Sequence, residues 1–439
     1  QDFVKNMVAG VGAVDLALLV VAADDGWMPQ TEEHLQILSY LGVTRGVVAL
    51  TKADLVQDTT LRVKEISDQL RNSPFAGADI IPLSTKTGAG LDDLKRALTA
   101  VVDQIPPHEN YNQPRLAADR IFTVQGIGTV VTGTLTGGTL QKGQTVLTLP
   151  PGRETRVRGL QSHNREQDVA QPGTRTAINL ADLSRYAVRR GATITLPELA
   201  QTTTTLDVCL ERSPRLLSDA SPLRNNTRVR VHHGTGHGPA RLVLAAGGVI
   251  ERGQNRLAQL RLEQPVCIWL GDRVVIRNWQ ETATLAGGLV LDVDGDRKRM
   301  RAPARMQLLQ ARIAAPKDPQ TWVETQLTRD GIVERDTLLR PSSFSPAEID
   351  KAVRQLLDSR KALQAGDWIA DKSRWQSTIA AMAQRVEDEH ASRPELPGLS
   401  LDQLHPVMAQ AFPGHDVFPE LIADLCRNGF IRRQNHIAR

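Results

Sequence analysis

The first part of the chain alternates between short apolar runs and longer polar or amphipathic stretches. The run at 15–23 is almost continuously apolar and the run at 47–50 entirely so, which is typical of parallel strands covered on both faces. Strands that alternate with helical segments predict an α/β domain with a parallel sheet. The expected elements are strands at 15–23, 47–50 and 80–83, a helix that ends at Leu41, and helices at about 59–72 and at 91–102.

Beyond residue 105 the hydrophobic pattern loses its helical period. The segment 105–114 is polar and proline-rich, which is typical of a linker, and short β-rich runs punctuated by glycine follow it. Such a pattern predicts a small antiparallel barrel. A second β-rich block at about 202–293 predicts another barrel. The runs that carry these predictions are 120–124, 126–134, 145–149 and 155–160 in the first block, and 258–263 and 271–277 in the second.

The last part of the chain becomes helical and polar after a basic stretch at 296–301. Ser345-Pro346-Ala347-Glu348 has the form of a capping box with proline at the first helical position. An apolar stripe follows it at helical spacing, and residues 362–370 then predict a short hairpin. Residues 352–371 align without a gap with residues 420–439. A repeated unit of helices and a two-stranded wing predicts tandem winged helices, and a helical spacer is the alternative.

Composition narrows the class of protein only slightly. The 439 residues carry a net charge of +4, which permits nucleic acid as a partner without demanding it. The three cysteines lie far apart, as expected in a reducing cytoplasm. No apolar run reaches the ~18 residues of a membrane span, and no signal segment opens the chain, so we expect a soluble, cytoplasmic protein.

The candidate chemistry begins where the 47–50 strand runs into Thr51-Lys52-Ala53-Asp54. Ligands bind at the carboxyl ends of strands in open α/β sheets. There, Asp54 can accept from both the ring N–H and the amine of guanine, and Lys52 can lay its stem over the base. Adenine would leave that carboxylate unpaired. The alternative is a carboxylate that only caps a helix.

A second loop, Ser84-Thr85-Lys86, follows the strand at 80–83 and could direct backbone N–H groups at the guanine carbonyl oxygen. No GxxxxGK[ST] string occurs in the 439 residues, so the usual phosphate cradle is not found in this sequence. The chain also opens at Gln1 without the first strands of such a domain. We therefore expect an amino-terminal truncation.

Four motifs in order resemble the GTPase domain of translation factors related to elongation factor Tu: DFVKNM from Asp2, ADDGWMPQTEEHL from Ala23, TKAD and STKTG. The resemblance implies a GTPase that binds GTP or GDP with Mg²⁺, whose ligands lie mostly upstream. It assigns Thr51, Lys52 and Asp54, and then Ser84, Thr85 and Lys86, to guanine. The family's hydrolytic histidine would lie before Gln1. No catalytic residue is therefore expected in this chain, which should be inactive as it stands.

The second β-rich block resembles the selenocysteine-specific elongation factors in its motifs HHGT from His232, LAQLRLE from Leu257, GDRVVIR from Gly271 and TLAGGLVLD from Thr284. The resemblance implies delivery of selenocysteinyl-tRNA to the ribosome at recoded UGA codons, aided by an mRNA hairpin, by a monomer. That family carries four winged-helix modules, and this chain shows about two. A carboxyl-terminal truncation, with the terminal modules missing, is therefore also expected.

The same resemblance places the selenocysteinyl pocket at Arg120 and Arg175. A selenol ionises more readily than a hydroxyl, so guanidinium groups would prefer it over serine. The alternative is that either arginine is an exposed strand residue. We interpret His232 and His233 as strand or loop residues and expect no metal site, because no acidic or cysteine partner is spaced with them.

The fold class expected from these patterns is a partial α/β GTPase domain, two antiparallel β-barrels and tandem winged helices. Two other functions stay open: a non-catalytic nucleic-acid-binding adaptor, and a GTPase of the initiation-factor-gamma type, which the winged-helix tail disfavours. The expected domains are the carboxyl-terminal part of a GTPase domain at 1–105, barrels at 112–198 and 201–295, and winged helices at 304–376 and 377–439, the last not necessarily complete.

Overall fold

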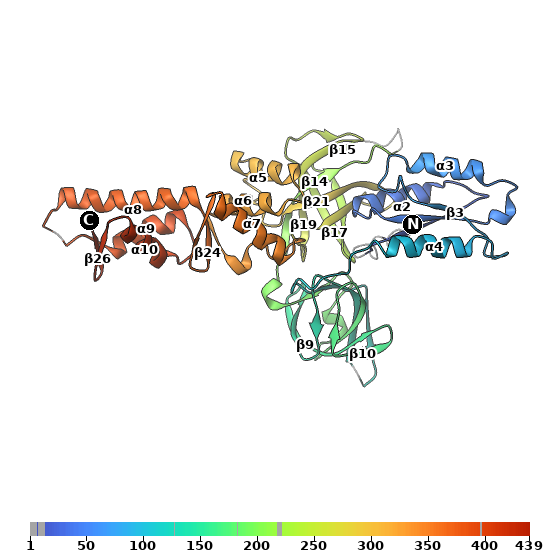
Figure 1. Cartoon of the computed structure of the whole chain (residues 1–439), viewed down its shortest axis with the longest axis horizontal. Helices are drawn as coiled ribbons and strands as arrows, with labels where there is room; N and C mark the ends of the chain where they lie inside the picture. The colour runs from blue at the N-terminus through green and yellow to red at the C-terminus, as the bar shows by residue number, and fades with distance from the viewer. Residues whose placement is uncertain (1–6, 8–13, 127, 182, 217–221, 396) are drawn as a thin grey trace. The chain divides into compact units, whose positions relative to one another are not determined.

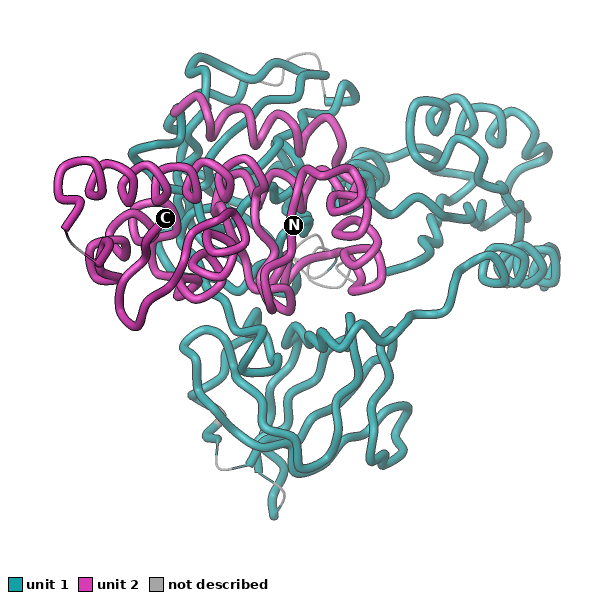
Figure 2. Tube along the Cα trace, turned by 60° about the vertical axis from the view of Figure 1, so that its left-hand side comes forward, with its two compact units in different colours: residues 1–301 teal, residues 302–439 magenta. Residues whose placement is uncertain are grey.

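A computed structural model describes residue 7 and residues 14–126, 128–181, 183–216, 222–395 and 397–439 (Figure 1). The first five residues of the DFVKNM motif and Ile127 lie outside this description. The chain forms two compact units, residues 1–301 and residues 302–439 (Figure 2). Among the described residues, no helix combines the length and the apolar composition that crossing a membrane requires.

The first unit begins with the predicted parallel sheet, whose strand order is β1-β2-β3. Leu35, Val48 and Ile66 are fully buried in the core between this sheet and its helices. Among the described residues, β1 lies at the edge of this sheet and nothing covers the face that bears Leu18 (44% exposed) and Val20 (60% exposed), so the expected cover on both faces is not found there. The elements are β1 (Ala17–Ala22), α2 (Pro29–Tyr40), β2 (Gly46–Thr51), η1 (Ala53–Leu55), α3 (Thr60–Leu70), β3 (Ile80–Pro82) and α4 (Leu91–Val102).

The second domain is the predicted antiparallel barrel. Its sheet closes because β9 pairs with both β12 and β8. A Cβ at Gly133 would lie 2.2 Å from the carbonyl oxygen of Ala117, so β6 and β4 can approach only with glycine there. The strands are β4 (Arg115–Ala117), β5 (Arg120–Val124), β6 (Gly128–Thr136), β7 (Leu140–Gln141), β8 (Thr145–Leu149), β9 (Arg153–Ser162), β10 (Arg165–Gln167), β11 (Val169–Ala170), β12 (Arg175–Leu180) and β13 (Thr193–Thr195), with short 3₁₀ turns η2 (Arg185–Ala187) and η3 (Pro197–Leu199).

The third domain is a closed barrel with the strand order β14-β19-β17-β16-β20-β21. Alternating apolar residues from all six strands fill its interior, as the period of two requires. The strands are β14 (Thr203–Glu211), β16 (Arg228–His233), β17 (Gly236–Leu244), β19 (Asn255–Val266), β20 (Arg273–Arg277) and β21 (Thr284–Asp292). A small two-stranded sheet pairs β15 (Leu223–Arg224) with β18 (Val249–Ile250).

Helix α2 packs directly against the barrel of the third domain. The phenol of Tyr40 accepts from the backbone N–H of Ser213 at 2.8 Å. Burial, the largest influence, raises the pKa of Tyr40 to about 12. A Cβ at Gly287 would lie 2.3 Å from the ring of Tyr40. The glycine on β21 therefore lets the helix sit against the barrel wall.

The second unit contains two winged helices with the same topology. The three-stranded sheets have the orders β22-β24-β23 and β25-β27-β26. The first module consists of α5 (Pro303–Ala314), α6 (Pro319–Asp330), β22 (Ile332–Glu334), η4 (Arg335–Thr337), α7 (Pro346–Asp358), β23 (Ala362–Ala365) and β24 (Trp368–Asp371). The second consists of α8 (Lys372–Ser392), β25 (Leu399–Ser400), α9 (Leu401–Ala411), α10 (Phe418–Arg427), β26 (Ile431–Arg433) and β27 (His436–Ala438).

The repeat found in the sequence is confirmed in three dimensions. The capping box at Ser345 is present with both hydrogen bonds, and Ile369 and its repeat partner Ile437 are both fully buried. The apolar core of the second module includes Ile332 and Ala370 of the first. Within the second module, the indole N–H of Trp375 donates to Asp424 at 2.8 Å. The predicted boundary at 376/377 falls inside α8. The bounds of all five domains stay predictions.

Candidate guanine and aminoacyl sites

The first candidate loop leaves β2 in a sharp turn. Thr51 is the last residue of β2, and Lys52 has a φ of 56°, a left-handed conformation that is uncommon for a residue other than glycine. Asp54 follows in η1 and is exposed. The backbone N–H of Ala53 donates to the carbonyl of Leu83 at 3.1 Å, which attaches this loop to the end of β3.

The ammonium of Lys52 lies over the end of β1. It donates to Asp24 at 2.8 Å and approaches Asp25 at 3.4 Å. The hydrogen bond from Lys52 is the main reason that the pKa of Asp24 falls below its usual range, and the same bond raises the pKa of Lys52. Both partners are exposed, so this ion pair contributes little to stability and can open when a ligand arrives.

The second candidate loop is organised by Ser84, whose side chain is buried. Its hydroxyl accepts from the backbone N–H groups of Lys86 and Thr87, each at 3.2 Å. Ser84 therefore shapes the loop rather than presenting its hydroxyl to solvent, whereas Thr85 and Lys86 are exposed.

The parallel register brings the two loops to one edge of the sheet. Leu50 on β2 lies beside Pro82 on β3, and each strand runs into its loop within two residues. Exposed Asp54 and the backbone of the 84–86 loop therefore flank the same strand ends. That arrangement suits a flat base with donors on one edge and a carbonyl oxygen on another.

The two predicted pocket arginines lie on either side of β6. Arg120 on β5 is opposite Thr132, and Arg175 on β12 is opposite Thr134. Because Thr132 and Thr134 are two residues apart, all four side chains share the outer face of the barrel. Both arginines are exposed. The fold thus brings together two residues that are far apart in the sequence.

Asp119 is a polar neighbour that sequence reasoning missed. It accepts from the guanidinium of Arg175 at 2.5 Å and 3.1 Å, and from the hydroxyl of Thr132 at 2.7 Å. Asp119 therefore fixes the orientation of Arg175 and offsets part of its charge. The only signal in the sequence was a carboxylate directly before Arg120.

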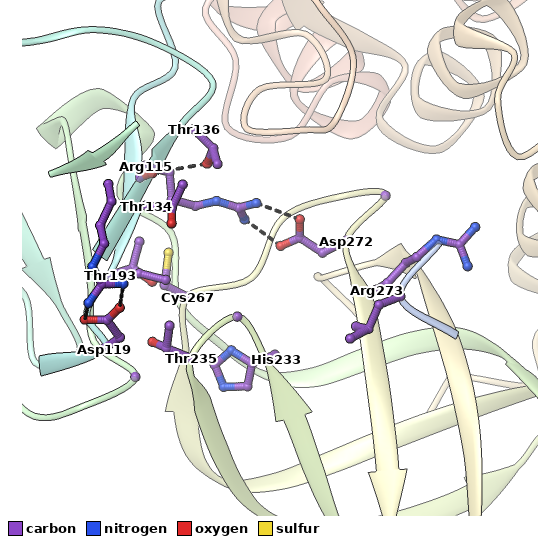
Figure 3. A pocket seen from close by; sticks show the side chains of 16 residues that line it. Arg115, Asp119, Thr134, Thr136, Thr193, His233, Thr235, Cys267, Asp272 and Arg273 are labelled. Atoms are coloured by element: carbon purple, nitrogen blue, oxygen red, sulfur yellow. Dashed lines mark hydrogen bonds and ion pairs between the residues drawn. The ribbon is translucent and has the colours of Figure 1, made fainter. Parts of the chain in front are cut away.

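A cavity of about 290 Å³ lies between the two barrels, next to this pair (Figure 3). Arg115 crosses it to form a two-point ion pair with Asp272, at 2.6 Å and 2.9 Å, and stacks on Trp269 with its guanidinium carbon 4.2 Å from the ring centroid. Burial alone would lower the pKa of Arg115, but the charge of Asp272 raises it. For the Cys267 thiol, burial raises the pKa, so this thiol is a poor nucleophile. The Arg115–Asp272 ion pair inside the cavity therefore links the two barrels.

A larger hollow of about 660 Å³ lies on the barrel of the second domain. Its lining combines an aromatic ring, aliphatic side chains and amides with both cationic and acidic groups, the latter Glu166 and Asp168. Phe122 is 40% exposed there. The lining includes Phe122, Val124, Val130, Lys142, Arg158 and Asn179.

Three protein-family models match parts of the chain. The elongation factor Tu GTP-binding domain matches residues 1–107, and elongation factor Tu domain 2 matches residues 128–195. The beta-barrel domain of selenocysteine-specific elongation factor matches residues 210–297. The order of these matches is the order of the three domains in the first unit.

The chain is 36% identical over 369 residues to the selenocysteine-specific elongation factor of Desulfomicrobium baculatum, which covers 83% of this chain and 57% of that protein. It is 32% identical over 404 residues to the one from Escherichia coli K12, covering 90% of this chain and 61% of that protein. A crystal structure of a bacterial selenocysteine-specific elongation factor aligns with all of this chain and 69% of its own, with a TM-score of 0.78 at 21% identity, so the two share a fold.

By its sheet with two loops, its two barrels and these matches, the chain is similar to elongation factor Tu in the GTP-binding domain and in domain 2. Over most of its length it is also similar to selenocysteine-specific elongation factors. The chain spans about three fifths of the length of these curated relatives.

Proposed function

We propose that the chain is part of a GTP-dependent elongation factor that delivers selenocysteinyl-tRNA to the ribosome at recoded UGA codons. The observation that carries the proposal is the pairing of Arg120 and Arg175 on one outer face of a barrel that resembles elongation factor Tu domain 2. The barrel of the third domain follows it and matches the beta-barrel domain of selenocysteine-specific elongation factor. Two exposed guanidinium groups on one face of a barrel favour an anionic aminoacyl side chain.

In this proposal, the guanine of GTP or GDP lies between the two loops at the ends of β2 and β3. Asp54 accepts from the ring N–H and the exocyclic amine, and the stem of Lys52 covers the base after its ammonium leaves Asp24. The 84–86 loop, held by Ser84, directs backbone N–H groups to the carbonyl oxygen. Bound nucleotide supplies the energy of a conformational change, and Mg²⁺ would act at its phosphates, away from these residues.

The aminoacyl end would lie on the second barrel. A guanidinium carries five N–H donors, and Asp119 occupies two of those of Arg175, so others are available for a selenolate. A selenolate is charged at neutral pH and the hydroxyl of serine is not, so two cationic groups favour the former. Asp119 limits this preference, because its charge partly cancels that of Arg175.

The second unit would contact RNA. Winged helices bind nucleic acid through a helix and a wing, and the wing of the second module carries Arg432 and Arg433, both exposed. An mRNA hairpin is the partner that this unit would help to read. The sequence holds no GxxxxGK[ST] string, so we also propose that residues 1–439 alone hydrolyse no GTP.

The test measures protection of the aminoacyl ester. Selenocysteinyl-tRNA and seryl-tRNA, identical except for one atom, are incubated with the chain, and deacylation is followed with time. The proposal predicts slower deacylation of selenocysteinyl-tRNA than of seryl-tRNA. Equal protection of both, or of neither at saturating protein, would refute it.

A further inference from the structure

Three side chains that could bind a metal ion meet on the barrel of the third domain: His232, His237 and Glu281. His232 and His237 are directly opposed in the β16–β17 ladder, so they project from the same face. Glu281 reaches them from the loop between β20 and β21. Its Oε1 lies 3.2 Å from Nε2 of His232 and 3.9 Å from Nε2 of His237.

These spacings match a shared metal ion. Zinc binds imidazole nitrogen at about 2.0–2.1 Å and carboxylate oxygen at about 2.0–2.2 Å, so neighbouring ligand atoms of a tetrahedron lie about 3.4 Å apart. The two measured separations fall on either side of that value. The imidazole rings are stacked, with centroids 5.2 Å apart and planes inclined by 19°. A small shift of His237, whose side chain is 47% exposed, would complete the geometry.

His232 has the properties of a ligand without its metal. The residue is only 2% exposed, and its Nε2 is buried without a hydrogen bond among the described residues, although it lies close to Glu281. A buried nitrogen of this kind costs stability unless something binds it.

The backbone holds Glu281 in place. Glu281 has a φ of 59°, a strained conformation of the sort found where structure serves a site. The side chain of Asn278 accepts from the backbone of Thr282 at 2.7 Å and of Ala283 at 3.1 Å, which closes the loop. Arg277 donates to the carbonyl of Glu281 at 2.7 Å, while its other nitrogen is paired with Glu33 at 2.9 Å. Glu33 thus compensates the positive charge next to the site.

We propose that His232, His237 and Glu281 bind one Zn²⁺ ion, with water in the fourth position. Two imidazoles and one carboxylate suit a transition metal rather than Mg²⁺ or Ca²⁺, which prefer oxygen ligands. The exposed side of His237 provides the path by which the ion enters. No acidic residue is near His232 in the sequence, and the fold supplies Glu281.

The ion would connect two parts of the barrel that contact different neighbours. The β16–β17 hairpin reaches the second barrel through Thr235, whose hydroxyl donates to the carbonyl of Ala118 at 2.7 Å. The loop of Glu281 reaches helix α2 through Arg277 and Glu33. Zinc bound here would make the contacts of the third domain with the barrel of the second domain and with helix α2 more rigid. We therefore assign the ion a structural role between the proposed aminoacyl and guanine sites.

The test uses the full chain without a histidine tag, stripped of metal with a chelator and titrated with Zn²⁺ against a chromophoric competitor. We expect one zinc per chain. His237→Ala and Glu281→Gln should weaken binding by more than about 100-fold, beyond the loss usual for a residue that only supports a ligand. His163→Ala, which removes an exposed histidine from the second barrel, should bind as the parent does. A parent that binds no zinc, or ligand variants that bind as well as it does, would overturn the site.

A second measurement does not depend on affinity. Co²⁺ in place of zinc should give the parent chain the visible absorption of a tetrahedral nitrogen and oxygen site, and the two ligand variants should lack it. Zn²⁺ should also raise the melting temperature of the parent and not that of Glu281→Gln. Because His237 is exposed, its replacement leaves the fold intact. An unchanged cobalt spectrum in that variant would place the metal elsewhere.

Discussion

Arg215 of the third domain and Glu32 of helix α2 form a two-point ion pair across the domain boundary, with Nε–Oε1 and Nη2–Oε2 distances of 2.8 Å and 2.6 Å. The same guanidinium donates to the backbone carbonyl of Gln69 at 2.6 Å, so one side chain binds two elements of the nucleotide domain. Both partners are largely buried, with side-chain exposures of 16% and 22%. Together with the Arg277–Glu33 pair, it couples the barrel of the third domain to α2.

Replacing Arg215 should loosen that boundary. We expect Arg215→Ala to destabilise the interface by about 2 kcal/mol, because it leaves a half-buried carboxylate without its charged donor. Hydrogen exchange of the α2 backbone should become faster in the same proportion. Arg228→Ala is the matched control, because Arg228 and Glu263 form an exposed pair on the same barrel, worth at most about 1 kcal/mol. Equal effects of the two variants would remove the special role of Arg215.

The same pair predicts a pH dependence. Burial, the largest single influence, raises the pKa of Glu32, but the hydrogen bonds from Arg215, Gln36 and Trp27 and the charge of Arg215 together lower it below the ordinary value of 4.5. A carboxylate whose pKa is lower in the folded state stabilises the fold above its unfolded pKa, and this stability is lost as the pH falls through the folded value. Stability should therefore decline below about pH 4.5. Glu32→Gln should show a shallower decline, measured as melting temperature against pH, and an unchanged slope would contradict the assignment.

The base preference tests Asp54. In Asp54→Asn an amide donates where the carboxylate accepted, so the preference should move from guanine to xanthine nucleotides. The shift should be at least about 100-fold, because a site that hydrogen-bonds its ligand strongly rejects an analogue that leaves polar groups unpaired. The measurement is a competition titration on the chain extended by a phosphate-loop segment. Asp58→Asn removes an exposed carboxylate that only binds the backbone of Thr60. If this control shifts equally, Asp54 is not the base contact.

The aminoacyl pocket is tested separately from the nucleotide. Arg120→Ala and Arg175→Ala should each weaken selenocysteinyl-tRNA binding about 10-fold or more and leave guanine binding intact, because both arginines lie on the second barrel. Arg156→Ala removes an exposed arginine from β9 of the same barrel and should have little effect. A variant at 120 or 175 that still distinguishes selenocysteinyl-tRNA from seryl-tRNA as the parent does would exclude that arginine.

Local pattern was enough to place the elements of the sheet and the two loops at its edge. The strands before Lys52 and Ser84 are short apolar runs, and parallel register alone then brings the loops together. The left-handed turn at Lys52 and the contact of its ammonium with Asp24 were not predictable, because neither depends on a pattern along the chain. The apolar run at β1 predicted a strand covered on both faces, whereas the described part of the chain leaves Leu18 and Val20 exposed on one face.

Contacts that depend on the strand order of the two barrels could not be predicted from the sequence. Asp119 reaches Arg175 only because β12 and β5 both pair with β6. Glu281 reaches His232 only because β20 lies beside β16 in the closed order. Such contacts join residues that share no spacing rule, so composition and periodicity carry no trace of them. The resemblance to a family supplied Arg120 and Arg175, but not the acidic partner between them.

The contact between the two winged helices is asymmetric. Trp375 and Leu421 of the second module lie in one apolar cluster with Ile332 and Ala370 of the first. The first module also buries side chains of its own, including Trp322 and Val353. A cut between the modules would therefore expose Ile332 and Ala370 to solvent and leave the remaining interior of the first module in place.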